Sequence, residues 1–281
     1  NETGRLLAGL FNANARTYFM TTDPSAQRQD DSTPRVGIVL IGDELLSGKR
    51  ADKHMPAVIE RLSARGMELS WARMVGDDAD LLTRTLRETL SSPDIVFSFG
   101  GIGATPDDRT RQCAAAAAGV ALEFNADGRA ILEEKWGDKA YPQRIHMVEW
   151  PVGAKVIPNP INQVPGFSLG DHHFVPGFPN MAWPMIEWVL DTHYAALHSH
   201  ERRVEYLVEV FDTPESALIE LMQSVMNAHP GARIACLPAA DGRRAIEFGV
   251  SGMPGVAAEA FDSLYEALVA KSVPLGEARQ R

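Results

Sequence analysis

Apolar and polar positions in residues 35–199 follow two alternating periods, which predict an α/β domain. The runs Val36–Ile41 and Ile95–Phe99 are short, apolar and each ends at a glycine, as is typical of parallel strands covered on both faces. Met55–Arg65 and Asp80–Leu90 instead repeat apolar residues at helical spacing. We therefore expect a three-layer fold with a mostly parallel sheet between helices.

The same patterns predict the remaining elements of this domain. They are an extended run at Glu68–Val75, helices at Asp107–Ala118, Ala126–Trp136 and Ala182–Ala196, and extended pieces near Lys155–Ile157 and His173–Val175.

The pattern changes after the polar segment His198–Arg203, which we expect to be a linker. Residues 204–281 are predicted to form a smaller α+β domain in the order β-α-β-β-α, as a structural or dimerising module without catalytic groups. Its predicted elements are Val204–Phe211, Thr213–Ala228, Ile234–Leu237, Ala245–Val250 and Val256–Ala270, with a hairpin turn at Asp241–Gly242.

Residues 1–34 are expected to be a flexible leader, or in part a segment added before a natural start at Met20. The first residues include Glu2 and lack the long apolar core of a signal peptide. The stretch Thr21–Pro34 is rich in Ser, Thr, Asp, Gln and Pro, a composition that does not support packing.

Composition and charge narrow the class of protein. The net charge of −10 and the lack of a Lys/Arg cluster disfavour nucleic acid as a partner. No apolar run approaches the roughly 20 residues that span a bilayer. The two cysteines, Cys113 and Cys236, fall in different predicted domains, so neither a disulfide framework nor a cysteine metal site is expected. A cytoplasmic protein without a membrane or nucleic-acid partner fits these features.

Two glycine-bearing loops follow predicted strands, where open α/β sheets bind ligands. The loop Gly42–Asp52 is not a P-loop, because its glycines are one residue too far apart and Arg50 stands where Ser or Thr is needed. The loop Gly100–Thr110 has only the start of a dinucleotide fingerprint, because Pro106 replaces its third glycine. Its three glycines beside a helix start nevertheless suit a phosphate.

The acids of these loops allow two interpretations. Thr105 fits a helix N-cap with Pro106 at the first helical position, so Asp107 and Asp108 would merely complement the helix dipole. Alternatively, carboxylates next to a bound phosphate require a bridging divalent cation. The acids of the first loop, Asp43, Glu44 and Asp52, raise the same expectation. Two acidic loops at adjacent strand ends favour the functional interpretation.

Other residues that often carry chemistry receive structural interpretations. His172 and His173 flank a predicted hairpin turn at Gly170–Asp171, and three further histidines lie near the linker. Solvent-facing positions explain both groups better than zinc does. The three are His193, His198 and His200. Cys113 lies among alanines and is expected to be a small buried residue. Four tryptophans, Trp136, Trp150, Trp183 and Trp188, are expected to pack in the core or an interface.

Taken together, these loops resemble those of molybdopterin-binding domains, and the chain is most similar to the competence/damage-inducible protein A family. The matching segments are Gly42–Leu46 with Gly48 and Asp52, Val75–Asp78, Gly100–Gly103 with Asp107, Asp108 and Thr110, Asn159–Pro160, Pro165–Phe167, and Pro176–Pro179 with Met185. The resemblance covers about Val36–Val189, and residues 204–281 are similar to the family's middle domain.

The resemblance implies a set of site residues. Asp52 and Asp108 would be the catalytic and metal-holding pair. The ligand-binding residues would be Asp43, Glu44, Gly48, Gly100, Gly101, Gly103, Thr105, Asp107, Thr110, Pro176 and Gly177. Three positions depart from the family pattern: Ala104 replaces a proline, His54 an asparagine, and Met181–Trp183 a more polar stretch.

The resemblance implies a protein that binds molybdopterin or a nucleotide phosphate and forms a homo-oligomer. It further implies metal-dependent cleavage of a diphosphate such as ADP-ribose or FAD with Mg²⁺, Mn²⁺ or Co²⁺, or alternatively molybdopterin adenylylation. A catalytically inert binding or assembly protein is a third expectation, which His54 favours and the intact acids oppose. We expect no C-terminal amidohydrolase domain of the family and therefore no deamidation of nicotinamide mononucleotide.

Overall fold

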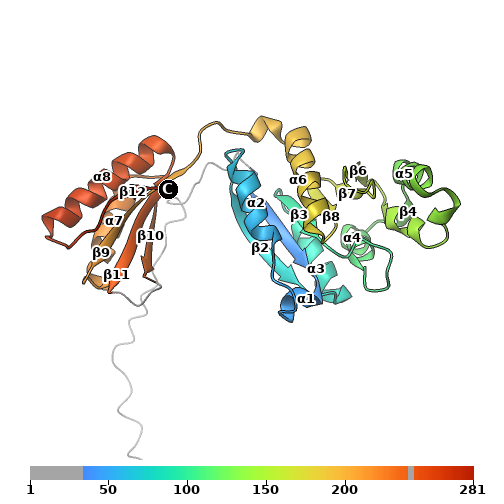
Figure 1. Ribbon diagram of the computed structural model, residues 1–281, viewed down its shortest axis with the longest axis horizontal. Helices are drawn as coiled ribbons and strands as arrows, with labels where there is room; N and C mark the ends of the chain where they lie inside the picture. The colour runs from blue at the N-terminus through green and yellow to red at the C-terminus, as the bar shows by residue number, and fades with distance from the viewer. Residues whose placement is uncertain (1–33, 240–243) are drawn as a thin grey trace, which may run out of the picture. The chain divides into compact units, whose positions relative to one another are not determined.

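The computed structural model describes residues 34–239 and 244–281, and its elements divide between two main sheets (Figure 1). Within the described ranges, no strand belongs to both sheets. The predicted leader lies outside these ranges up to residue 33. The domain bounds at residues 199 and 204 stay a prediction.

The first sheet is six-stranded and mostly parallel. Its strand order is β2-β1-β3-β8-β7-β6, in which β2, β1, β3 and β8 are parallel and β7 and β6 are antiparallel. The strands are β1 (Val36–Ile41), β2 (Leu69–Val75), β3 (Ile95–Phe99), β6 (Lys155–Ile157), β7 (Gly166–Leu169) and β8 (His172–Val175). This arrangement confirms the predicted α/β fold class.

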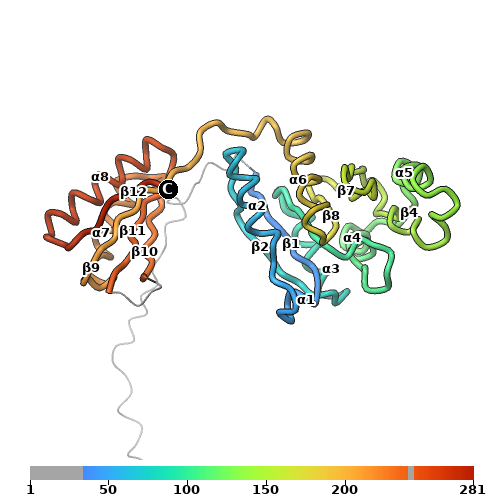
Figure 2. The backbone as a smooth tube through the Cα atoms, in the orientation of Figure 1, coloured from blue at the N-terminus to red at the C-terminus, as the bar shows by residue number. Residues whose placement is uncertain are grey.

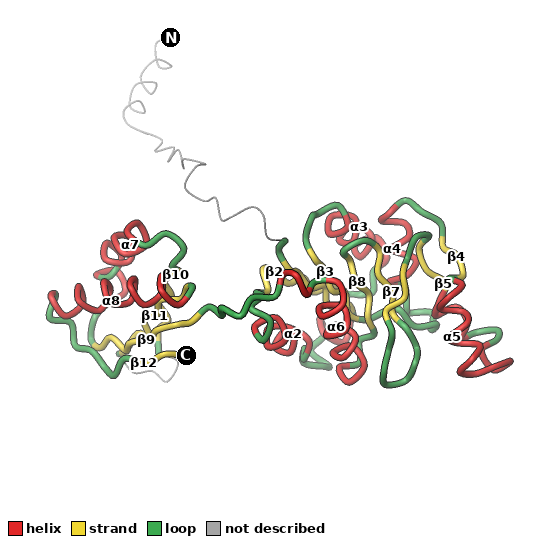
Figure 3. Tube along the Cα trace, turned by 90° about the horizontal axis from the view of Figure 1, so that it is seen from above, coloured by secondary structure: helices red, strands yellow, loops and turns green. Residues whose placement is uncertain are grey.

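Helices cover both faces of this sheet, as Figure 3 shows from above. Alternate residues of β1 point to opposite faces: Ile38 and Leu40 pack with α2 and α6, whereas Val39 and Ile41 pack with α3 and α4. The helices are α1 (Asp43–Leu46), α2 (His54–Ser63), α3 (Ala79–Leu90), α4 (Thr110–Ala118), α5 (Ala126–Trp136) and α6 (Pro179–His193), with 3₁₀ turns at Gly137–Ala140, Arg144–Val148 and Ala195–Leu197. The three predicted layers are therefore present.

A small two-stranded sheet, β4 (Leu122–Phe124) and β5 (Glu149–Pro151), flanks α4 and α5 and was not predicted. Both strands have only three residues, too few to show a period of two. Trp150 of β5 is 1% exposed and packs in the core, as expected. Cys113 on α4 is also buried, as expected.

The second sheet is antiparallel, with the order β10-β11-β9-β12. Its elements are β9 (Val204–Phe211), a 3₁₀ turn at Glu215–Ala217, α7 (Ile219–Ala228), β10 (Arg233–Pro238), β11 (Ala245–Gly252), α8 (Pro254–Ala270) and β12 (Arg279–Gln280). The predicted β-α-β-β-α order is confirmed, and β12 is an addition. The predicted turn at Asp241–Gly242 lies outside the described residues.

Three predicted helix starts are wrong. Helix α7 begins at Ile219 rather than Thr213, because a 3₁₀ turn at Glu215–Ala217 precedes it. Helix α4 begins at Thr110 rather than Asp107, so Thr105 is not its N-cap and Pro106 is not its first residue. Helix α6 begins at Pro179 rather than Ala182, because proline suits the first helical position, where no N–H partner is needed.

The prediction that His172 and His173 face solvent is also wrong, since each is 2% exposed. Both lie on β8, which is paired on both edges by β3 and β7 and covered on both faces. Ser98 Oγ lies 2.7 Å from His172 Nε2, and Ser168 Oγ lies 2.8 Å from His173 Nδ1. Burial lowers the pKa of each imidazole to about 3, so both are neutral hydrogen-bonding groups of the core. The prediction does hold for His193 and His200, which are exposed.

Among the described residues, no helix has both the length and the apolar character needed to cross a bilayer.

Candidate functional site

The two glycine-bearing loops meet at the carboxyl edge of the six-stranded sheet. Strands β1 and β3 are parallel neighbours, with Leu40 opposite Phe99, so the loops that follow them leave the sheet side by side. A Cβ added to Gly100 would lie 2.6 Å from the Ile41 carbonyl oxygen. Figure 2 shows β1 and β2 running together toward α1 at this edge. The predicted adjacency of the two loops is therefore present.

The turn after β3 exposes backbone N–H groups. Gly100 and Gly101 have φ values of 103° and 67°, which favour glycine. Thr110 secures the turn: its Oγ1 donates to Gly100 O over 2.9 Å, and its N–H donates to Gly101 O over 3.0 Å. The N–H groups of Gly101, Ile102 and Gly103 meet no protein acceptor within the described ranges. Consecutive free N–H groups of this kind suit an anion.

Asp108 closes the next turn instead of opening a helix. Its Oδ2 accepts from Thr105 N at 3.0 Å and Thr105 Oγ1 at 2.5 Å, and Asp108 N donates to Thr105 O at 3.0 Å. A Cβ at Gly103 would overlap Asp108 Oδ2. This reciprocal bonding explains why α4 starts later than predicted, because the turn satisfies its own polar groups before the helix begins.

In the first loop, Asp52 caps α2. Its Oδ1 accepts from His54 N at 2.8 Å, and its Oδ2 accepts from Met55 N at 3.0 Å. These bonds satisfy two N–H groups that a helix start leaves free. Each carboxylate oxygen retains a lone pair for a further partner.

A further acid, Asp77, joins the site although the residue-by-residue expectations did not include it. Asp43 N donates to Asp77 Oδ2, and Asp77 N donates to Asp43 Oδ1, both over 3.1 Å. Burial raises the pKa of Asp77, and the charges of Asp43, Glu44 and Asp107 raise it further, against a lowering backbone hydrogen bond from Asp43. Acids from three strand ends therefore gather here. The sequence offered one signal for Asp77: it follows the run that forms β2, and β2 pairs with β1.

The third segment, Pro176–Gly177, follows β8 and reaches the same place. A Cβ at Gly177 would lie 3.4 Å from Gly100 Cα. His54 Nε2 is 3.2 Å from Gly177 O, so this nitrogen carries the proton. The imidazole is 6% exposed, lies 4.3 Å from the Phe99 ring, and has a pKa lowered mainly by burial. Its Nδ1 is buried without a partner in the described part of the chain.

The predicted site residues differ in their exposure and in their contacts with the other loops. Gly48 is exposed, and a Cβ there would have open space, so no contact ties it to the other loops. Thr105 and Asp107 are exposed beside the glycine turn, whereas Thr110 is fully buried beneath it.

The donor set fits a divalent cation that also binds the ligand. Among the described residues, no three His, Cys, Asp or Glu side chains are arranged to hold a metal ion by themselves. Mg²⁺, however, is usually bound through one or two carboxylates together with waters and substrate phosphates. Asp108 supplies such a carboxylate beside the glycine turn, since a Cβ at Gly103 would overlap its Oδ2. Asp52 supplies a second one in the first loop, at the start of α2.

Both glycine-bearing loops lie in a part of the chain that matches a known protein family. Residues 37–196 match the family described as a probable molybdopterin binding domain. The chain is 36% identical to a CinA-like protein of Anaeromyxobacter dehalogenans over 209 residues, which are 71% of this chain and 51% of that protein. It is 32% identical to a CinA-like protein of Citrifermentans bemidjiense over 200 residues, 68% of this chain and 48% of that one. The chain thus spans about half the length of these relatives.

A solved structure shares the fold of just over half of this chain. The protein CinA of Thermoplasma acidophilum, described as of unknown function, aligns with a TM-score of 0.52 and 26% sequence identity. The alignment covers 57% of this chain and 97% of that one.

Proposed function

Because the chain belongs to the CinA-like family and carries its molybdopterin-binding domain, we propose that the carboxyl edge of the six-stranded sheet binds the phosphate or diphosphate of a nucleotide or of molybdopterin. The observation that carries this proposal is the run of three free N–H groups at Gly101, Ile102 and Gly103. An anionic oxygen is the partner that such a run of N–H groups favours.

The surrounding acids require a cation when a phosphate binds. Asp77 lies close enough to three other carboxylates for their charges to raise its pKa, so a phosphate alone would add to an unfavourable negative field. A divalent ion held by Asp52 and Asp108 would neutralise this charge and polarise the bound phosphate.

The proposed reaction is hydrolysis of a nucleotide diphosphate of the ADP-ribose or FAD class. The glycine turn would hold phosphate oxygens and stabilise the negative charge that grows on them in the transition state. Thr105 would keep the Asp108 carboxylate oriented through its two hydrogen bonds, and the backbone of α2 would do the same for Asp52. A cytoplasmic homo-oligomer belongs to the same proposal.

A nucleotide panel tests this function. The purified chain is incubated with ADP-ribose, FAD or ATP and with Mg²⁺, Mn²⁺ or Co²⁺, and products are separated by chromatography. AMP released from ADP-ribose or FAD, and abolished by EDTA, supports the hydrolase. AMP transfer that requires molybdopterin supports adenylylation instead. If nucleotides bind without turnover, the chain is an inert binding protein; if neither nucleotide nor molybdopterin binds, the proposal is wrong.

A further inference from the structure

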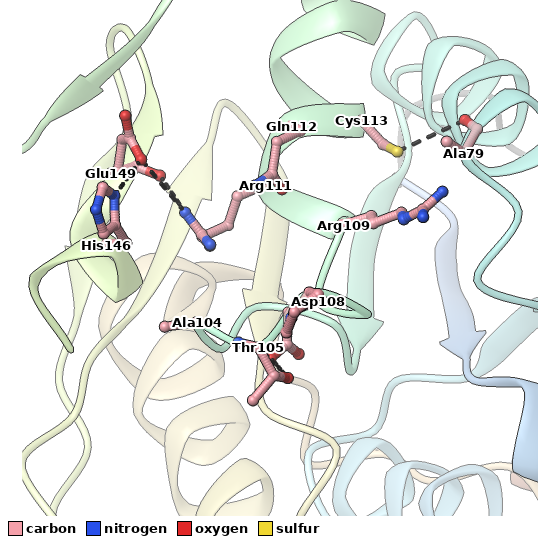
Figure 4. Close-up of a pocket in the computed structure, with 11 residues that line it drawn as sticks. Ala79, Ala104, Thr105, Asp108, Arg109, Arg111, Gln112, Cys113, His146 and Glu149 are labelled. Carbon is pink, nitrogen blue, oxygen red and sulfur yellow. Dashed lines mark hydrogen bonds and ion pairs between the residues drawn. The ribbon is translucent and has the colours of Figure 1, made fainter. Parts of the chain in front are cut away.

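A pocket of about 500 Å³ lies at the start of α4, beside the turn that Asp108 closes (Figure 4). The turn Ala104–Asp108, the first residues of α4 and the segment His146–Glu149 contribute to its lining. Its volume falls in the range of small-molecule sites. None of the site residues expected from the sequence comes from the segment His146–Glu149, which forms one side of the pocket.

Arg111 connects this pocket to the glycine turn. Its side chain is 3% exposed. Nε and Nη2 donate to Gly103 O over 3.1 and 2.8 Å, and Nη1 donates to Glu149 O over 3.1 Å. Three bonds to carbonyls offset part of the cost of burying the guanidinium. Arg111 is therefore a positioning residue that holds the glycine turn against β5.

The two sides of the pocket differ chemically. Cys113 and Ala79 lie on one side in Figure 4, with the thiol turned to the Ala79 carbonyl at 3.5 Å. His146 and Glu149 lie on the other, where Glu149 Oε2 accepts from His146 Nδ1 at 2.9 Å. The pocket thus offers a weakly polar wall for a flat ring and a carboxylate acceptor for hydroxyl groups.

The charges argue against a second phosphate site. The cations Arg109 and Arg111 are matched by the anions Asp108 and Glu149 among the lining residues. Arg111 also directs three of its donors at backbone carbonyls. A ligand group without net charge fits this lining better than an anion does.

We propose that this pocket binds the nucleoside part of a nucleotide whose phosphates lie on the glycine turn, with Glu149 accepting from the ribose hydroxyls. The inference rests on the proposed function: Ala104, which lines the pocket, directly follows Gly103, where the run of free N–H groups ends. A carboxylate that binds ribose hydroxyls is a common solution in nucleotide sites on α/β sheets. The weakly polar wall then packs against the base.

The first test obstructs the pocket. Gln112 lines it and is exposed on α4, and its side chain makes no hydrogen bond to the described residues. Gln112→Trp fills the pocket, and Gln112→Ala is the matched control. Calorimetry with Mg²⁺ compares ADP-ribose with inorganic pyrophosphate. We expect Gln112→Trp to weaken ADP-ribose binding by about 10-fold or more and to leave pyrophosphate binding unchanged, while Gln112→Ala changes neither appreciably.

The second test addresses the ribose contact. ATP and 2′,3′-dideoxy-ATP are titrated into the wild type, Glu149→Gln and the control Glu123→Gln, which alters an exposed acid of β4. The wild type and the control should bind ATP about 10-fold more tightly than the dideoxy analogue, because the analogue lacks the hydroxyls that would donate to the Glu149 carboxylate. Glu149→Gln should abolish most of that preference.

The outcomes separate the two proposals. Unchanged ADP-ribose binding in Gln112→Trp, or equal affinity of the wild type for ATP and its dideoxy analogue, overturns the nucleoside pocket while phosphate binding at the glycine turn stands. A wild type that binds neither pyrophosphate nor any nucleotide overturns the proposed function, and the pocket inference with it.

Discussion

The imidazole Nε2 of His54 lies 3.2 Å from the carbonyl oxygen of Gly177, and this hydrogen bond joins the helix after the first loop to the third segment of the site. Gly177 in turn approaches Gly100 so closely that a Cβ there would lie 3.4 Å from Gly100 Cα. The imidazole also packs on Phe99, the last residue of β3. His54 is therefore placed to hold all three segments in register.

Removing the donor of His54 should loosen this junction. His54→Leu leaves the Gly177 carbonyl without its partner, and we expect a loss of about 1–3 kcal/mol in the free energy of unfolding. His54→Gln retains an N–H₂ donor at similar reach and should lose clearly less. Urea unfolding of both variants measures the difference. Equal losses would mean that His54 stabilises the fold through packing on Phe99 and not through the hydrogen bond.

Acid should destabilise the fold through its buried histidines. Burial lowers the pKa of His172 and His173 to about 3, whereas the unfolded chain protonates near 6.5. Between these values the unfolded state binds more protons, so stability is lost as pH falls from about 6.5 toward 3. Each histidine should contribute a slope of about 1.4 kcal/mol per pH unit in that window.

Unfolding free energies measured from pH 7 to pH 4 test this expectation. His173→Gln should reduce the slope by about 1.4 kcal/mol per pH unit, which is the contribution of one proton. The control His200→Gln, at an exposed position, should leave the slope unchanged. A slope that is the same in all three proteins would contradict the assignment.

Asp108→Asn separates a structural carboxylate from a metal-holding one. The amide oxygen can still accept from Thr105 N, so stability should fall by no more than about 1 kcal/mol. Loss of the charge should weaken Mn²⁺ affinity and nucleotide turnover at least about 10-fold. Melting temperature and Mn²⁺ titration are compared with Asp127→Asn, which alters an acid in the first turn of α5. An unchanged Mn²⁺ affinity would reduce Asp108 to a residue that only closes its turn.

Alanine at Gly101 should damage the site beyond its backbone cost. Gly101 and Gly119 have φ values of 67° and 71°, so alanine is strained by about 1–2 kcal/mol at either position. At Gly101 the new Cβ also overlaps Thr110 Oγ1, whereas at Gly119 it meets open space. Gly101→Ala should therefore lose more stability than Gly119→Ala and should alone impair pyrophosphate binding. Calorimetry and urea unfolding check both; parallel losses in the two variants would exclude a special role for the turn.

Much of the fold was predictable because it follows from the local periodicity of apolar and polar residues. The predicted bounds of β1 and β3 match the structure, since a run buried on both faces is mostly apolar and a glycine follows each of these two runs. Helix α5 also matches its prediction, because Asn125 caps it and Gly137 follows its last residue. The loops at the carboxyl edge could be inferred in the same way, from where strands end.

Long-range pairing decided the rest. His172 and His173 looked like polar turn residues, but β8 is inserted between β3 and β7, and its neighbours supply hydroxyl partners for both imidazoles. The pattern within a segment reports its period and cannot report which strand lies beside it.

For the candidate site too, the sequence determined one part and the tertiary structure decided the other. The sequence by itself determined which acids and glycines follow each strand. Only the tertiary structure decided that Asp77 shares a site with Asp43, that Asp108 bonds to Thr105 instead of starting a helix, and that Arg111 ties Gly103 to Glu149. These contacts join residues whose positions depend on strand order and on competing hydrogen bonds within a turn, and neither leaves a repeating pattern of apolar and polar residues.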